Sequence, residues 1–159
     1  MLTERGTVQL VTFLLDDQRY ALRLDAVERV IPAVTLTPLP GAPEIVLGLI
    51  DVGGDIIPVV DIRERFLLPR REMGVNDCII IARTSRQTLG ILVDAPDEVI
   101  ERVETEIDRG DGILMGSEYV EGVLRLEGGL VLIHDLERFL SIEEEKSLAG
   151  ALAEKGDSE

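Results

Sequence analysis

The 159-residue sequence is short of the residue types on which most metal and cofactor chemistry depends. It contains one cysteine, Cys78, one histidine, His134, and no tryptophan, and aromatic residues make up 3% of the chain. One cysteine can form neither an internal disulfide nor a thiolate metal site, and one histidine has no partner imidazole. We therefore expect no metal and no cofactor, with Cys78 as a small core residue and His134 as a packed or surface residue of a strand.

The chain also has no excess of positive charge and no long apolar run. Its formal net charge of -15 repels phosphate backbones and anionic lipid head groups, and the few aromatic residues offer little for stacking on bases. The apolar runs are too short, and too interrupted by glycine, proline and charge, to cross a bilayer. The first residues mix charges and do not resemble a secretion signal. These features predict a soluble cytoplasmic protein that binds no nucleic acid and does not insert into membranes.

What the sequence does contain is a series of short segments rich in Val, Ile and Leu, separated by turn residues, which is typical of β-strands. In several of them apolar and polar residues alternate, which predicts one buried face and one wet face. The pattern favours an all-β fold of curled sheets or small barrels. The predicted strands are Val8–Leu15, Tyr20–Leu24, Ile45–Ile50, Ile56–Val60, Cys78–Ala82, Leu89–Val93, Val99–Val103, Tyr119–Leu126 and Leu130–Ile133.

The strongest pattern is an internal repeat. The stretch GLIDVGGDIIPVVDIRERF beginning at Gly48 returns as GVLRLEGGLVLIHDLERFL beginning at Gly122, an offset of 74 residues. Upstream, Leu24–Ile31 resembles Val93–Ile100 at an offset of 69, so five residues are inserted between the two registers. We place the insertion between 101 and 121, where 108–112 reads as an exposed loop. The chain is predicted to hold two duplicated β modules of roughly seventy residues each.

Each copy of the repeat predicts a hairpin followed by a capped turn. Gly53-Gly54 and Gly128-Gly129 stand between apolar runs, where a tight turn with positive φ is easy for glycine. The repeat also makes Asp61 and Asp135 equivalent, which raises the alternative of an acidic pair that shares a proton, as in an aspartic protease. Neither is followed by the small hydroxyl residue and glycine of that chemistry, and the D-x-x-E spacing at Asp61 is typical of helix capping. We predict structural caps and no catalytic residue.

Two further segments have a distinct character. Ser141–Glu144 has the form of a capping box, which predicts a C-terminal helix and tail over 142–159 that docks through Leu148 and Leu152, with partner binding as the alternative. The segment Val30–Pro43 is uncharged and contains four prolines and five large aliphatic residues. Such a segment needs a cover, so either Leu36 and Leu39 fold back as lids, or the segment forms a partly exposed docking groove.

An ordered series of motifs resembles one known family over nearly the whole chain. The series begins with Val11-Thr12-Phe13, Tyr20-Ala21-Leu22 and Val27-Glu28-Arg29-Val30-Ile31. It continues with Leu39-Pro40-Gly41-Ala42-Pro43, Gly48-Leu49-Ile50 and Ile57-Pro58-Val59-Val60-Asp61-Ile62-Arg63. In order and spacing it resembles the CheW-type coupling proteins of bacterial chemotaxis. The resemblance implies an all-β fold with a minor helix, in which 1–141 is a CheW-like domain. That domain would comprise two intertwined five-stranded barrels, SH3-like or OB-like, over roughly 1–70 and 71–141.

The same resemblance implies an adaptor without enzyme activity. Such proteins join the cytoplasmic helices of chemoreceptors to the regulatory domain of the histidine kinase CheA. Transferred to this sequence, the receptor-binding groove draws on Val27, Val30, Ile31 and Val99. The kinase-facing surface lies near Gly53 and Gly54.

One motif departs from the family pattern. An Asn-Leu-Arg-Gly signature is usual in the first hairpin, whereas this chain has Asp51-Val52-Gly53-Gly54, so a glycine stands where an arginine is expected. An arginine at an interface commonly anchors binding. Its absence suggests a CheW-like protein of a divergent chemosensory system, for instance one that controls surface motility. A generic β-barrel module that binds an unrelated peptide is the further alternative.

Overall fold

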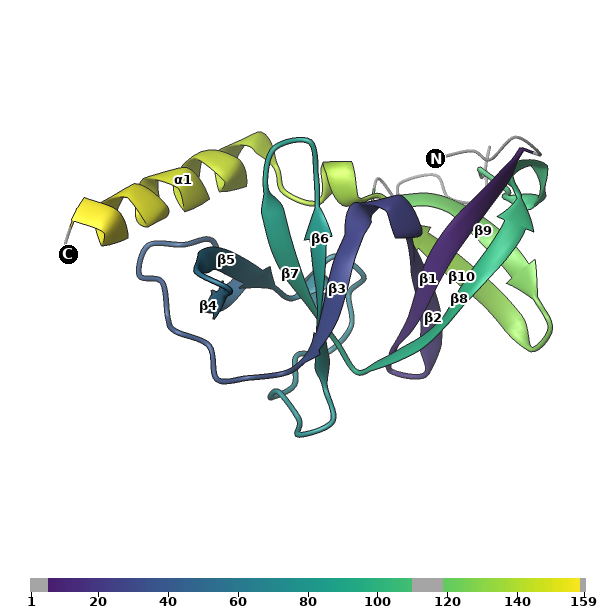
Figure 1. Ribbon diagram of the computed structural model, residues 1–159, viewed down its shortest axis with the longest axis horizontal. Coiled ribbons are helices and arrows are strands. Elements are labelled where there is room, and N and C mark those ends of the chain that lie inside the picture. Colours follow the sequence, from purple (N-terminus) through teal and green to yellow (C-terminus); the bar gives the residue numbers. More distant parts are fainter. Residues whose placement is uncertain (1–5, 110–118, 158–159) are drawn as a thin grey trace.

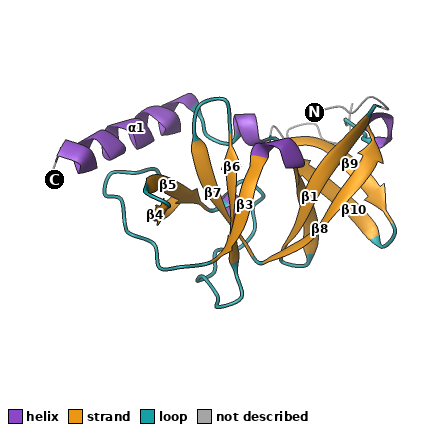
Figure 2. Ribbon diagram, viewed as in Figure 1, coloured by secondary structure: helices purple, strands orange, loops and turns teal. Residues whose placement is uncertain are grey.

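The computed structural model describes residues 6–109 and 119–157, which form two five-stranded sheets and a C-terminal helix (Figures 1 and 2). Sheet A has the strand order β8-β1-β2-β10-β9, and sheet B has the order β3-β6-β7-β5-β4. Neighbouring strands are antiparallel except for β2 with β10 and β5 with β7. The mostly β fold with one helix is as predicted; the closure of each sheet into a barrel stays a prediction.

The bounds of the elements follow the chain closely. Sheet A contains β1 (Thr7–Leu15), β2 (Gln18–Arg23), β8 (Ala95–Val103), β9 (Val120–Leu126) and β10 (Gly129–His134). Sheet B contains β3 (Val27–Pro32), β4 (Val46–Val52), β5 (Asp55–Val60), β6 (Cys78–Arg83) and β7 (Thr88–Val93). Four short 3-10 helices, η1 (Leu24–Ala26), η2 (Ile62–Glu64), η3 (Glu104–Glu106) and η4 (Leu136–Arg138), precede the α-helix α1 (Ile142–Asp157).

The two sheets exchange strands between the two sequence repeats. β4, β5 and η2 recur as β9, β10 and η4 at the same offset of 74 residues, and β1, β2 and β3 correspond in order to β6, β7 and β8. When each strand is replaced by its equivalent, the order of sheet A becomes the order of sheet B. Each sheet therefore takes two strands from one repeat and three from the other. The boundary predicted near residue 70 separates the two sequence repeats, between β5 and β6. It does not separate the two sheets, because β5 and β6 both belong to sheet B.

All nine predicted strands are confirmed, and β3 is the strand that was not predicted. Its residues are half-buried or exposed throughout, and it ends at Pro32, so it lacks the alternation that marks a strand with one buried face. The signal that could have found it is the repeat, because 27–32 is equivalent to part of β8. The predicted insertion loop falls largely on 110–118, which lie outside the described residues.

The predicted turns and caps are confirmed. Gly53 and Gly54 have φ angles of 61° and 96°, and the β4–β5 turn is closed by the Gly54 amide, which donates to Asp51 Oδ1 at 2.8 Å. Asp61 accepts the Arg63 amide at 2.9 Å at the start of η2. Asp135 accepts the Glu137 amide at 3.2 Å at the start of η4. Both acids therefore serve as caps, although the turns that they cap are 3-10 and not α-helical.

The helix α1 begins with the predicted capping box and docks as predicted. Ser141 Oγ accepts the Glu144 amide at 3.1 Å, and the Glu144 carboxylate accepts the Ser141 amide at 2.9 Å. Leu148 is 1% exposed and Leu152 packs beside it against the same apolar cluster. Among the described residues, no helix combines the length and the apolar character needed to cross a bilayer.

The core is divided into three clusters. One lies within sheet A and includes Leu10, Ile100 and Ile133, and a second lies within sheet B and includes Ile79 and Ile81. The third, which we call the junction core, joins the two sheets. From sheet A it receives Phe13, Leu15, Tyr20 and Leu22, and from sheet B it receives Ile80, Ala82, Leu89, Ile91 and Val93.

The segment 33–45 is largely a cover for these cores. Leu39 is buried in the junction core, and Leu36 packs against the cluster of sheet B, as the lid alternative predicts. Val34 stays 48% exposed. Cys78 is half-buried beside the junction core and is thus less enclosed than predicted, because it begins β6 at the rim of the sheet.

All the aromatic residues of the chain gather near the junction with the single histidine. Ring centroids are 6.0 Å apart for Phe13 and Tyr20, and 4.6 Å apart for Tyr20 and Phe66. His134 follows at 5.4 Å from Phe66 and 5.5 Å from Phe139. The guanidinium of Arg65 lies 5.0 Å from the centroid of the Tyr119 ring and 5.6 Å from that of Phe139. The few aromatic side chains are thus concentrated where the two sheets meet.

Acid should destabilise the protein through His134. This side chain is 3% exposed, and among the described residues neither ring nitrogen has a hydrogen-bond partner. Burial, and next the charge of Arg65, lower the pKa of His134 from 6.5 to about 3. Between these values the unfolded chain binds a proton that the folded protein does not, so stability is full above pH 6.5 and falls as the pH drops. We expect a loss of about 2 kcal/mol in the free energy of unfolding between pH 7.5 and pH 5.

The matched variant is His134→Leu, which keeps an apolar side chain of similar size and removes the titrating group. Urea denaturation at a series of pH values should show a flat profile for this variant above pH 5, where few carboxylates titrate. Equal slopes for the two proteins would contradict the assignment.

Candidate docking surface

The candidate site lies on the edge strands β3 and β8, where the two sheets meet (Figure 1). Within the described part of the chain β3 pairs with β6 alone and β8 with β1 alone, so each is an edge strand of its sheet. The two strands are equivalents in the internal repeat, and Val30 on β3 corresponds to Val99 on β8. Each repeat therefore contributes one equivalent strand to any surface that β3 and β8 form.

A β-bulge on each strand sets which side chains face outward. On β3 the register shifts between Val27 and Arg29, and Val27 pairs with Ala82 while Val30 pairs with Ile80. Since Ala82 and Ile80 are two residues apart, they share a face of β6, and Val27 and Val30 consequently share a face of β3. Without the extra residue of the bulge, these two valines would point to opposite sides.

The bulge on β8 repeats this arrangement. Pro96 pairs with Phe13 and Val99 pairs with Val11, so Pro96 and Val99 also share a face. The buried hydroxyl of Thr12 fills the bulge, because Oγ1 accepts the Glu98 amide at 3.0 Å and lies 2.9 Å from Asp97 Oδ2. These contacts fix the backbone from which Val99 projects.

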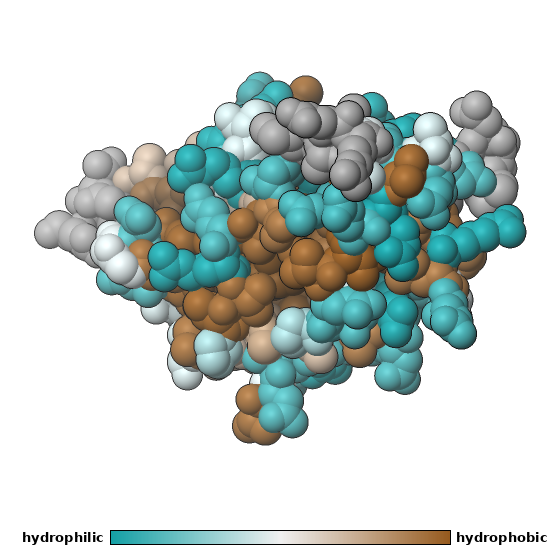
Figure 3. All heavy atoms as spheres, turned by 45° about the vertical axis from the view of Figure 1, so that its right-hand side comes forward, coloured by the Kyte–Doolittle hydropathy of each residue, from teal (hydrophilic) through white to brown (hydrophobic). Residues whose placement is uncertain are grey.

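Exposed aliphatic side chains mark this surface. Val30, Val99 and Val103 are 40%, 57% and 41% exposed, whereas Val27 is half-buried against the junction core. Figure 3 shows apolar side chains gathered in a band across this side of the molecule, with hydrophilic side chains above and below. We call the set Val27, Val30, Pro96, Val99 and Val103 the edge-strand surface. Of these residues, Val27 packs against the junction core.

Ile31 lies apart from the other three residues predicted for the groove. It pairs with Ile79, on the face of β6 opposite to Ile80, and packs against the core cluster of sheet B. Its side chain therefore supports β3 from within. Pro96 and Val103 were not predicted; the equivalence of Pro96 with Val27, and the alternation that links Val103 to Val99, are the signals that could have found them.

Comparison with known proteins decides the family. The family model for the CheW-like domain matches residues 9–145. The chain belongs to the CheW-like domain family. It is 29% identical to the chemotaxis protein CheW of Rhizobium meliloti, over 89% of this chain and 93% of the relative. It is 28% identical to the chemotaxis protein CheW of Thermotoga maritima, over 83% of this chain and 87% of the relative.

A solved structure shows the same fold. The crystal structure of the scaffolding protein TtCheW from Thermoanaerobacter tengcongensis matches with a TM-score of 0.78 and 30% identity, over 86% of this chain and 90% of that one. The resemblance seen in the sequence is thereby confirmed, and so is a family-level role as a non-enzymatic scaffold of chemotaxis signalling. Most of α1 lies beyond the residues that the family model matches.

In this CheW-like protein the β4–β5 hairpin and the edge-strand surface belong to opposite ends of the strand order of sheet B. β4 forms the opposite edge of the sheet from β3. Gly53 and Gly54 are exposed at the turn, and Ile56 beside them is 57% exposed. The residues predicted for the kinase contact thus lie on other strands than those predicted for the receptor groove.

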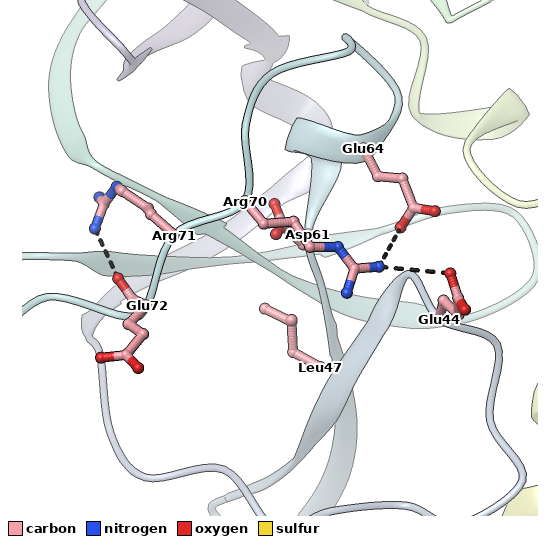
Figure 4. A pocket seen from close by; sticks show the side chains of 7 residues that line it. All are labelled: Glu44, Leu47, Asp61, Glu64, Arg70, Arg71 and Glu72. Carbon is pink, nitrogen blue, oxygen red and sulfur yellow. Dashed lines mark hydrogen bonds and ion pairs between the residues drawn. The ribbon is translucent and has the colours of Figure 1, made fainter.

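The cavities of the CheW-like fold do not assemble the acidic pair considered above. A cavity of about 360 Å³ is lined by Asp61, by Leu47 and by charged residues that include Arg70 and its two acidic partners (Figure 4). There Arg70 lies 3.6 Å from Glu44 and 3.5 Å from Glu64. Asp135 lines a different cavity, of about 200 Å³, so the two carboxylates serve separate sites. Within 6–109 and 119–157, no group of three or more candidate ligands could hold a metal ion.

Proposed function

We propose that this CheW-like protein couples the cytoplasmic helices of a chemoreceptor to the histidine kinase CheA in the cytoplasm. The receptor helix would lie on the edge-strand surface, with Val27, Val30 and Val99 as its main contacts and Ile31 as their support from behind. The observation that carries the proposal is the pair of equivalent, bulge-directed valines, Val30 and Val99, which are 40% and 57% exposed. Monomeric proteins seldom expose contiguous apolar surface without a partner for it.

The β4–β5 hairpin is the proposed kinase contact. Gly53 and Gly54 have no side chains, so the contact would use their backbone groups together with the exposed Ile56. Its position at the far edge of sheet B supports the simultaneous binding of two partners, which a coupling protein requires.

A role in a divergent chemosensory system is the second candidate, and Gly53 is the observation that favours it. Its φ of 61° is in the left-handed region, where any residue with a Cβ is strained by about 1 kcal/mol. The turn thus suits glycine better than the arginine usual in the family. A divergent system of this kind would contain a kinase that binds a β4–β5 hairpin without that arginine.

Replacing Val30 by aspartate should abolish coupling. The change places a charge in the middle of an apolar contact, which we expect to weaken binding to a receptor signalling domain at least about a hundredfold. Because Val30 is 40% exposed, the fold should tolerate the substitution. Titration calorimetry with a chemoreceptor signalling domain and a CheA phosphorylation assay would measure the loss.

The matched control is Val75→Asp, since Val75 is 98% exposed and lies in the loop before β6. This control should bind and couple like the parent protein. If Val30→Asp also kept its affinity, the edge-strand surface would not be the receptor site.

A further inference from the structure

The cavity of about 360 Å³ beside β4 and η2 contains a buried carboxylate of which only one oxygen is paired. Asp61 is 7% exposed and lines this cavity. Its Oδ1 accepts the Arg63 amide at 2.9 Å, and its own amide donates to the Ile45 carbonyl at 2.9 Å, so its position is fixed. Among the described residues, Oδ2 has neither a hydrogen bond nor an ion pair. Buried polar atoms of native proteins are nearly always paired, so this oxygen points to a ligand from outside the chain.

The internal repeat shows what Oδ2 of Asp61 lacks. The equivalent residue is Asp135, whose Oδ2 lies 3.6 Å from Nε of Arg138. At the same offset of 74 residues, the equivalent of Arg138 is Glu64. The first repeat therefore has an acid at the position where the second repeat has the cation that pairs with its cap.

Acidic groups outnumber the cations around this cavity. Arg71 is already paired with Asp77 and Asp94, neither of which lines the cavity. Arg70 is then left to balance four carboxylates. The charged lining residues are Glu44, Asp61, Glu64, Glu72, Arg70 and Arg71.

Arg70 covers this acidic cavity only loosely. Its side chain is 66% exposed, and its guanidinium lies 3.6 Å from Glu44 and 3.5 Å from Glu64, which makes two weak pairs. Figure 4 shows the guanidinium between these two glutamates. Leu47, which is 39% exposed, adds an aliphatic part to the lining. The outer part of the cavity thus already holds a cation on an aliphatic stem, but that cation makes no ion pair with Asp61.

We propose that this cavity binds an organic cation, a guanidinium or a primary ammonium group on an aliphatic stem. The cation pairs with Asp61 Oδ2 and Glu64, its stem lies against Leu47, and the exposed side chain of Arg70 moves aside. A metal ion does not fit, because no group of three or more side chains in the described part of the chain could ligate one. The cation could come from an arginine or lysine side chain of a protein partner or from a free amine. The inference does not depend on the receptor and kinase contacts proposed above.

The test titrates the full chain with three small probes and follows the chemical shifts of its backbone amides by NMR. Butylguanidinium should bind with a dissociation constant on the order of 1 mM. The guanidinium ion has no stem and butylurea has no charge, so each should bind at least about tenfold more weakly. The titrations are made at about 0.15 M salt, where the general attraction of cations to an acidic protein is screened.

Variants of the full chain locate the probe. Asp61→Asn keeps an oxygen that can cap η2 and removes the charge, whereas Glu64→Arg introduces the arrangement of the second repeat; each should weaken the binding of butylguanidinium at least about tenfold. Arg70→Met removes the competing cation and should strengthen binding several-fold. The matched control is Asp135→Asn, which makes the same change in charge at the equivalent cap and should leave the affinity unchanged. Urea denaturation confirms that each variant is folded.

The Glu64→Arg variant also distinguishes the two sources of the cation. If a protein partner supplies it, this variant should bind either CheA or a receptor signalling domain about tenfold more weakly than the parent does. If the cation is a free amine, the affinities for both proteins should equal those of the parent, and spermidine should bind the parent about tenfold tighter than it binds Glu64→Arg.

Three results would each overturn the inference. The first is an equal affinity of butylguanidinium for the parent, for Asp61→Asn and for Glu64→Arg, or no binding to any of them. The second is an equal loss in Asp61→Asn and Asp135→Asn, because the probe would then respond only to the net charge of the protein. The third is binding of butylurea as tight as that of butylguanidinium, which would show an apolar pocket and not a cation site.

Discussion

Substituting Arg63 by methionine should lower the free energy of unfolding by about 3 kcal/mol, because it leaves carboxylates at the junction without their buried partner. The Arg63 side chain is 6% exposed. Nη1 donates to Asp16 Oδ1 at 2.8 Å, in the β1–β2 turn, and Nη2 pairs with Asp94 between β7 and β8. Methionine keeps the length of the side chain but none of its donors. Urea denaturation at pH 7 measures the change.

The difference between the parent and Arg63→Met should shrink in acid. Burial works to raise the pKa of Asp94, but hydrogen bonds from Arg63, from the Asp16 amide and from Arg71 outweigh it and hold that pKa below its usual value. A depressed carboxyl pKa stabilises the fold above the pKa of the unfolded chain, about 3.9, and this stabilisation is lost as the pH falls further.

The control for this prediction is Arg70→Met. The side chain of Arg70 is 66% exposed, and its pairs with Glu44 and Glu64 measure 3.6 and 3.5 Å. Exposed pairs of this kind contribute about 0.5 kcal/mol or less. A loss at Arg70 as large as the loss at Arg63 would mean that the buried network does not hold the sheets together.

Replacing Gly122 by valine should be at least as damaging, with an expected loss of about 3 kcal/mol or more. A Cβ at this position would lie 2.5 Å from Ile107 Cγ2 and 3.0 Å from the Asp108 carbonyl oxygen. That approach is fixed because Asp108 and Val123 exchange backbone hydrogen bonds of 2.9 and 2.8 Å. Any larger residue must break this bridge or displace the buried Ile107. Thermal and urea unfolding would measure the effect.

The repeat supplies a second position for the same test. A Cβ on Gly48, the equivalent of Gly122, would lie 2.8 Å from the Thr37 carbonyl oxygen and 2.9 Å from Leu36 Cβ, so Gly48→Val should cost a similar amount.

On α1, by contrast, a Cβ added to Gly150 would meet no atom beyond its own helix backbone within 4 Å. Gly150→Ala should therefore stabilise the protein by about 1 kcal/mol through helix propensity. If Gly122→Val lowered the free energy of unfolding only slightly, residues 107–108 would be able to move away from the added side chain.

Much of this fold follows from local sequence. The parts that could not be predicted in this way are those that depend on long-range strand pairing. The Gly53-Gly54 turn, the Asp61 cap and the capping box at Ser141 each involve residues within a few positions of one another, so their patterns were sufficient to predict them. The repeat predicted the duplication. It could not predict the exchange of strands, because a duplicated sequence is equally compatible with sheets that keep to their own repeat.

The candidate site shows the same division. Val27, Val30 and Val99 remain residues predicted for the groove from the family resemblance, whereas the placement of Ile31 depends on a bulge that reverses the alternation along β3. A bulge is a property of two paired strands and not of one segment.

The strand exchange also imposes an order on biosynthesis. Sheet B draws all its strands from 27–93 and can be completed before β8, β9 and β10 have left the ribosome. The hairpin of β1 and β2 emerges first, yet its remaining partners arrive last. Its apolar residues Phe13, Leu15 and Tyr20 face the junction core. The finished sheet B can thus shelter the nascent hairpin from aggregation until translation delivers the strands that complete its own sheet.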